Sequence, residues 1–328
     1  MLGGSRATLI RMVVLALLWG SGFLWIKLAL EGGLAPLHIT VVRCALGALV
    51  LLVLARSARQ SLPRDRRTWG HLVVAAFFCN ALPFFLFGVG EQTVDSGVAG
   101  VLNATTPLWS FAIGLALGTE RGFGPLRLTG LLLGFAGILL IFAPWHQAGL
   151  TGAGAWALVA AAVSYAVAFA YMARHLIGRG TAPLALSAAQ LLMATGLTLP
   201  VLPAAGAASG APTPTAWIAV VVLGVFGTGI TFHLNSRLIA DEGPTAAATV
   251  GYLLPVVSVV LGAAVLGEQL GIRVVAGMAV VLLGVGLTRG GRPAGKPGRT
   301  APAGRTTSPV PAPAAPAPQE RVHRSSDG

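Results

Sequence analysis

The feature that most constrains this chain is a series of ten apolar stretches, each close to the roughly 20 residues that a helix needs to cross a bilayer. They are continuous rather than alternating, so helices are predicted rather than the strands of a barrel. Only 10% of the residues are charged and the mean hydropathy is +0.79, too apolar for a soluble surface. We therefore predict an all-α integral membrane protein. The expected helices lie near residues 12–30, 38–55, 71–90, 97–118, 126–143, 154–173, 184–202, 216–236, 245–266 and 273–288.

The distribution of Lys and Arg predicts the orientation, because these residues concentrate in cytoplasmic loops. With the N-terminus in the cytoplasm, the opposite loops hold only Arg273. Both termini are then cytoplasmic, and the localisation is a multi-pass cell membrane protein. The net charge of +12 reflects this orientation, so no nucleic-acid partner is expected. The arginines placed inside are Arg6, Arg11, Arg56, Arg59, Arg64, Arg66, Arg67, Arg121, Arg127, Arg174, Arg179 and Arg237.

We expect no catalytic or metal-binding role for the two ends of the chain or for its two cysteines. No signal-peptidase site follows Arg11, so we expect the first apolar stretch to be retained as a helix. Pro, Ala, Gly and Arg dominate residues 289–328, which are predicted to be a disordered basic cytoplasmic tail. This tail is either inert or in contact with anionic lipid headgroups. Cys44 and Cys79 lie in apolar stretches and are expected to be buried hydrophobes.

Two segments from different halves of the chain match in register. They are VLNATTPLWSFAIGLALGTE and VGYLLPVVSVVLGAAVLGE, in which Pro107 and Pro255 each stand thirteen positions before a glutamate. They form the predicted fourth and ninth helices, and an offset of five helices reverses the orientation. Glycines continue the match seven positions apart, at Gly130 and Gly137 and again at Gly277 and Gly284. The predicted domains are two inverted five-helix repeats, residues 1–145 and 146–288, followed by the tail 289–328.

The chain resembles the EamA-type transporters of the drug/metabolite transporter superfamily over roughly residues 8–288. The resemblance is carried by LALLWGSGFLWIKLAL (15–30), VVRCALGALVLL (41–52), GVLNATTPLWSFAIGLALGTE (100–120) and the partner segment that ends at Glu268. It implies ten helices in two repeats around a central cavity, and in most members the export of metabolites. The second half departs from the first in having SYAVAFAYMARHL (164–176) where a Trp-Gly-Ser motif would stand.

The fourth and ninth helices also carry the sharpest local features. Pro107 and Pro255 each remove a hydrogen bond inside a predicted helix, which indicates either a hinge beside a cavity or a passive kink. Polar residues at steps of three and four on one helix face indicate a neighbouring helix or an aqueous cavity. Aromatic side chains would add an apolar wall. The predicted cavity residues are Trp19, Asn103, Thr106, Ser110, Tyr165, Tyr252 and Ser258.

Charged and titratable side chains within the apolar stretches are a second group of candidates. A Lys or Arg at a helix centre costs about 2.5–3.5 kcal/mol on insertion scales, so Lys27 and Arg43 are expected near the outer helix ends. We hypothesise an outer and an inner gate that form alternately; the alternative is snorkelling to headgroups. His233 is either a proton relay, because imidazole titrates near neutral pH, or a structural histidine. The candidate gate charges are Lys27, Arg43, Glu91, Arg174, Arg237, Asp241 and Glu242.

These patterns favour a secondary transporter that moves a small organic metabolite or drug-like compound by alternating access, with export implied by the resemblance. The sequence has no P-loop, metal-ligand cluster or catalytic triad, so neither an enzyme nor a cofactor is expected. The expected partners are a small-molecule substrate and membrane lipid. A passive channel or facilitator stays open as an alternative, followed by a sensor or scaffold and then a membrane enzyme.

Overall fold

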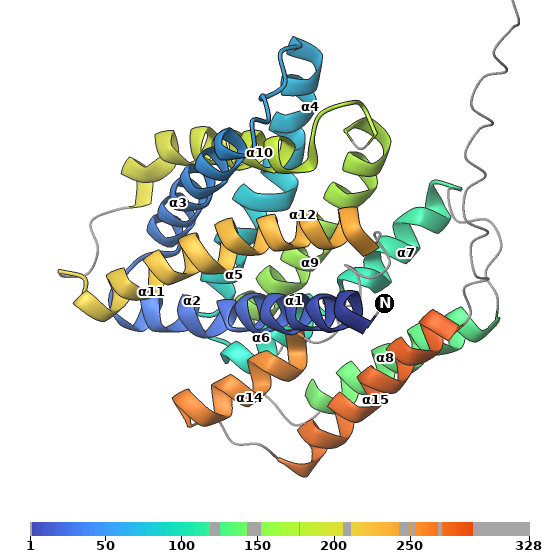
Figure 1. Cartoon of the computed structure of the whole chain (residues 1–328). Helices are drawn as coiled ribbons and strands as arrows, with labels where there is room; N and C mark the ends of the chain where they lie inside the picture. The colour runs from blue at the N-terminus through green and yellow to red at the C-terminus, as the bar shows by residue number, and fades with distance from the viewer. Residues whose placement is uncertain are drawn as a thin grey trace, which may run out of the picture. The chain divides into compact units, whose positions relative to one another are not determined.

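The computed structural model describes residues 2–118, 125–142, 152–176, 178–205, 211–242, 250, 254–267 and 271–290 (Figure 1). All of them belong to one compact unit, Met1–Gly291. Within these ranges every regular element is a helix and no strand is present, as predicted.

Six helices of the described ranges are long and apolar enough to cross a membrane, and each coincides with a predicted stretch. They are Ile10–Glu31, Pro36–Ser57, Arg66–Gly90, Ala153–His175, Pro183–Pro203 and Pro214–Asn235. The other four predicted stretches also contain described helices, which are α6 with α7, α8, α14 and α15. A total of ten membrane crossings in two inverted repeats stays a prediction.

The N-terminal half begins with α1 (Leu2–Gly20) and α2 (Gly22–Glu31), which join at Ser21. Prolines in the first turn suit a helix start, because their missing N–H is not needed there; α3 (Pro36–Ser57) starts in this way. The third span contains a π-helical segment between two α-helices. The remaining elements of this half are α4 (Arg66–Ala76), η1 (Phe77–Ala81), α5 (Leu82–Gly90), α6 (Ser96–Asn103), α7 (Thr106–Ala116) and α8 (Pro125–Phe142).

The C-terminal half repeats this order of elements as far as it is described. Its third span also contains a π-helical segment, η3 (Val225–Ile230), between α11 (Pro214–Gly224) and α12 (Thr231–Glu242). The other elements are α9 (Ala153–His175), α10 (Pro183–Thr198), η2 (Leu199–Ala205), α14 (Leu254–Leu266) and α15 (Ile272–Gly290). Because α15 reaches Gly290, it includes the first two residues of the predicted tail; residues 291–328 lie outside the described ranges.

The predicted fourth helix is interrupted, so the expectation that Pro107 lies inside a continuous helix is wrong. α6 ends at Asn103 and α7 begins at Thr106, which makes Pro107 a first-turn residue rather than an interior one. The hydroxyls of Thr105 and Thr106 donate to the carbonyls of Leu102 and Asn103, at 2.6 and 2.7 Å. The Thr106 bond stabilises the break, because Pro107 has no N–H to donate to the Asn103 carbonyl, whereas the Leu102 carbonyl also accepts the Thr105 N–H at 3.0 Å. Pro255 is likewise the second residue of α14.

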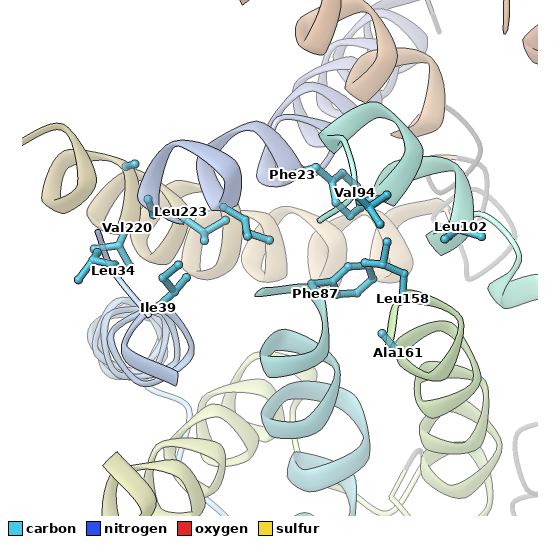
Figure 2. Close-up of a cluster of buried hydrophobic side chains, with 14 of the residues drawn as sticks. Phe23, Leu34, Ile39, Phe87, Val94, Leu102, Leu158, Ala161, Val220 and Leu223 are labelled. Carbon is cyan, nitrogen blue, oxygen red and sulfur yellow. The ribbon is translucent and has the colours of Figure 1, made fainter. Parts of the chain in front are cut away.

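Figure 2 shows a cluster of buried apolar side chains that come from both halves. Phe23, Ile39 and Phe87 of the first half pack with Leu158 and Leu223 of the second. In a bilayer lipid tails are as apolar as these side chains, so close packing rather than exclusion from water must hold the helices together.

Glycines allow the closest helix contacts. α8 and α15 lie side by side in Figure 1, and a Cβ at Gly284 would stand only 2.6 Å from the carbonyl oxygen of Gly130. A Cβ at Gly137 would stand 2.8 Å from the carbonyl oxygen of Gly277. The four glycines that continue the sequence repeat therefore lie in one helix–helix interface.

Candidate functional site

The outer group of predicted gate charges lies together. The Lys27 ammonium donates to the carbonyl of Glu91 at 2.9 Å and to that of Val94 at 3.4 Å, in the turn that follows α5. The Glu91 side chain is fully buried. Carbonyls at a helix end have no partner inside the helix, so Lys27 stabilises this end of the third span.

Arg43 of α3 is turned onto other helices rather than toward headgroups. Its Nε–H donates to the hydroxyl of Thr228 in η3 at 2.9 Å. Its guanidinium carbon lies 3.6 Å from the ring centroid of Phe84 on α5, a cation–π distance. Arg43 therefore connects α3 with η3 and α5.

A buried amide pair also joins the two halves. The Gln190 amide of α10 donates to the Asn80 side-chain oxygen in η1 at 2.6 Å, and both residues are almost fully buried. Among the described residues, the Asn80 amide nitrogen has no hydrogen-bond partner. Ser164 of α9 donates to the Phe78 carbonyl of η1 at 2.7 Å. These side chains fix a π-helical segment, a type of element that is often found at functional sites.

The predicted aromatic residues are placed by ring contacts. Tyr165 stacks on Phe169 at 6.0 Å and lies 6.1 Å from Phe87, so it connects α9 with α5. Trp19 meets Phe232 edge to face at 6.5 Å, which connects α1 with α12. Both aromatics are half-buried between the two halves.

The predicted polar cavity residues of the fourth and ninth helices have different surroundings. The Thr106 hydroxyl donates a hydrogen bond to the Asn103 carbonyl at the helix break. The Asn103 side-chain oxygen is buried without a hydrogen-bond partner in the described part of the chain. Ser110 is half-buried on α7. Tyr252 and the side chain of Ser258 lie outside the described residues.

Of the predicted inner gate charges, the structure describes the side chains of Arg174 and Arg237. Arg174 is exposed at the end of α9, where the neighbouring His175 stacks on His71 with ring centroids 4.7 Å apart. The described part of the chain contains no group of three His, Cys, Asp or Glu that could hold a metal ion.

The remaining candidates lie on α12. Arg237 is exposed, and its charge acts on the half-buried His233. His233 Nδ1 is buried and has no hydrogen-bond partner among the described residues. The side chains of Asp241 and Glu242 lie outside the described residues. The structure thus brings together Lys27, Arg43 and Glu91 and does not describe a complete inner group.

Sequence reasoning missed Asn80, Gln190 and Thr228. Each is a single polar residue in an apolar run, in FFCNALPFF, SAAQLLMA and VFGTGITF. An isolated polar residue inside a predicted span was the available signal, because such residues are expected to face the bundle interior.

Membrane-length apolar helices whose buried polar groups bond across the bundle define a multi-pass α-helical membrane protein. A model of the EamA-like transporter family matches the chain twice, over residues 7–143 and 152–290. The chain belongs to the EamA-like transporter family and is a membrane transporter, which confirms the resemblance seen in the sequence.

Similar proteins carry the same kind of name. The chain is 26% identical over 254 residues to the uncharacterized transporter YdfC of Bacillus subtilis, covering 76% of this chain and 80% of that one. It is 26% identical over 259 residues to the uncharacterized inner membrane transporter YedA of Escherichia coli K12, covering 78% and 82%. A solved structure titled only as a crystal structure of protein matches with a TM-score of 0.66 at 22% identity, covering 87% of this chain and 98% of that one, which supports the fold alone.

Proposed function

We propose that this chain is a secondary carrier that exports small organic compounds across the cytoplasmic membrane by alternating access. Two inverted five-helix repeats would expose one central site to either side in turn. The substrate would contact the half-buried aromatic and polar side chains that lie between the halves, chiefly Trp19, Asn103 and Tyr165, together with Ser110, Tyr252 and Ser258.

The observation that carries this proposal is the internal repeat. The family model matches two blocks of nearly equal length, and the two π-helical segments begin 148 positions apart, at Phe77 and Val225. Pro107 and Pro255 are separated by the same 148 positions. Each of these features recurs five helices later, which is the offset that an inverted repeat requires.

Contacts between helix ends support the proposed orientation. The Thr213 N–H donates to the Gly32 carbonyl at 2.9 Å, and both residues are assigned to outer loops. His71 Nδ1 lies 2.8 Å from the Tyr171 hydroxyl, at the ends assigned to the cytoplasm. Each contact joins the first half to the second on a single side of the membrane.

Gate and coupling roles are part of the same proposal. Lys27, Arg43 and Glu91 would close the outer side, and Arg174, Arg237, Asp241 and Glu242 would close the inner side. His233 would carry a coupling proton, since its ring nitrogen is buried without a bonded partner among the described residues.

Counterflow in proteoliposomes tests the carrier function. Vesicles loaded with unlabelled amino acids, polyamines, nucleosides or small lipophilic cations would be assayed for uptake of the labelled compound, with and without a pH gradient. We expect saturable exchange of one class, reduced by Asn103→Ala but unchanged by Gly134→Ala, since a Cβ at Gly134 would meet no atom within 4 Å. Flux without saturation or exchange would indicate a passive channel instead.

A further inference from the structure

Four polar residues, three of them buried and Arg43 half-buried, occupy equivalent positions in the two halves. Arg43 and Gln190 stand 147 positions apart, and each lies seven residues after the proline that begins its helix, Pro36 or Pro183. Asn80 and Thr228 stand 148 positions apart, and each is the fourth residue of its π-helical segment.

The hydrogen bonds of these residues cross from one half to the other. Arg43 of the first half donates to Thr228 of the second, and Gln190 of the second half donates to Asn80 of the first. We call Arg43–Thr228 the outer pair and Asn80–Gln190 the inner pair. In each pair, the second span of one half, α3 or α10, bonds to the π-helical segment of the other half. The symmetry of an inverted repeat would therefore exchange the outer pair with the inner pair.

The two pairs differ in strength. The outer pair has an ionised donor, and charge-assisted hydrogen bonds are roughly twice as strong as neutral ones. The Phe84 ring under the guanidinium adds a cation–π contact. The inner pair is neutral and leaves the Asn80 amide nitrogen without a partner in the described part of the chain. Breaking the inner pair therefore costs less.

Glycines allow the helices that carry the outer pair to pack in close contact. A Cβ at Gly224 would lie 2.8 Å from the Cβ of Leu46, and one at Gly229 would lie 2.7 Å from that of Val50. A Cβ at Gly47 would lie 2.8 Å from a Thr228 methyl group. Because these glycine contacts are so close, α3 and η3 cannot slide past each other while Arg43 and Thr228 remain bonded.

We infer that the two pairs are reciprocal conformational contacts: the outer pair holds the outer side closed, the inner pair holds the inner side closed, and transport breaks them in turn. This inference rests on the inverted repeat of the proposed function. Both pairs are bonded in this structure, which on this inference is closed on both sides. Since the outer pair is the stronger, the inner pair opens more readily, toward the cytoplasm, where an exporter takes up its substrate.

Two buried, repeat-equivalent positions provide the test. Ile39 and Leu186 each lie four residues before Arg43 or Gln190 and are 2% and 8% exposed. Ile39→Cys and Leu186→Cys would be introduced singly into a full-length Cys44→Ala/Cys79→Ala background. Their reaction with a membrane-impermeant maleimide would be timed in right-side-out vesicles for position 39 and inside-out vesicles for position 186.

The expected result is a pair of opposite changes. Thr228→Val should speed labelling at position 39 and slow it at position 186, by about two- to tenfold, which is the shift caused by one lost net hydrogen bond. Asn80→Leu, or Gln190→Ala if that variant does not fold, should do the reverse. Thr228→Ser keeps the hydroxyl and should behave as the parent.

Matched controls separate this role from a structural one. Thr231→Val and Thr198→Val remove buried hydroxyls that donate to carbonyls three and four residues earlier in the same span, and neither should change the ratio of the two rates. Labelling that rises at both positions in Thr228→Val, or equal shifts in the controls, would overturn the inference.

The labelling requires no substrate, so its outcome is independent of counterflow. Reciprocal labelling without exchange of any tested compound would contradict the proposed substrate range and leave the paired contacts in place. Saturable exchange without reciprocity would retain the carrier and reject the two pairs.

Discussion

At the scale of single residues, buried polar groups within the spans are the costly features of this chain. The structure gives Asn80, Gln190, Ser164 and Thr228 partners on other helices, whereas several buried threonines bond within their own spans. The sequence predicted that Lys27, Arg43 and Glu91 lie at similar depth, because their positions in the spans could be counted. It could not predict that Arg43 bonds to Thr228, since hydropathy along a single helix contains no information about which neighbour it faces.

Lys27 gives the first prediction. Lys27→Met removes the donor to the Glu91 and Val94 carbonyls, so the turn after α5 is left with unsatisfied acceptors. We expect the free energy of unfolding in detergent to fall by about 1–3 kcal/mol, the cost of a buried group left unpaired. Lys27→Arg keeps charged donors and should recover most of that loss; equal destabilisation by both variants would show that the two bonds contribute little.

Asp65 gives a prediction about pH. It caps α4, and its hydrogen bonds with Thr68 hold the pKa of this exposed carboxyl below its ordinary 3.8. Because the folded pKa is the lower one, the stabilisation is complete above the unfolded pKa and is lost as the pH falls through the folded value. The difference in melting temperature between wild type and Asp65→Ala should therefore shrink below about pH 4. A difference that stays constant from pH 6 to pH 3 would contradict this.

At the scale of helices, the sequence predicted the elements well and their interruptions poorly. The stretch expected near 38–55 is Pro36–Ser57, and the one near 154–173 is Ala153–His175. Apolar length determines such spans. The π-helical segments and the break after Asn103 were missed, because a change in hydrogen-bond register does not alter hydropathy.

The glycine interface between α8 and α15 gives an element-scale prediction. Gly284→Val would force a side chain against the backbone of Gly130 and Gly134, which cannot move aside as a flexible side chain would. We expect a loss of about 1–3 kcal/mol in the free energy of unfolding, typical of overpacking. Gly134→Val is the matched control on α8, since a Cβ there meets nothing within 4 Å. Similar melting temperatures for the two variants would mean that the helices separate easily.

At the scale of the whole molecule, the two halves meet through repeat-equivalent groups. Arg43 and Gln190 bond across the halves, and the glycines of α8 face those of α15. Equivalent surfaces that meet each other are what an inverted repeat would generate. The orientation of each helix is therefore the property on which the proposed mechanism depends.

Cysteine accessibility tests this orientation directly. Gln92 and Ala211 are exposed and assigned to the outer side, whereas Ser61 and Ala173 are exposed and assigned to the cytoplasm. In the Cys44→Ala/Cys79→Ala background, single cysteines at positions 92 and 211 should react with an impermeant maleimide in right-side-out vesicles. Those at 61 and 173 should react only after permeabilisation.

Since 92 and 211 come from different halves, their labelling from the same side requires that the third and seventh spans both end outside. Labelling of 61 and 92 from one side would contradict a membrane-crossing third span, and with it the inversion that relates the two halves.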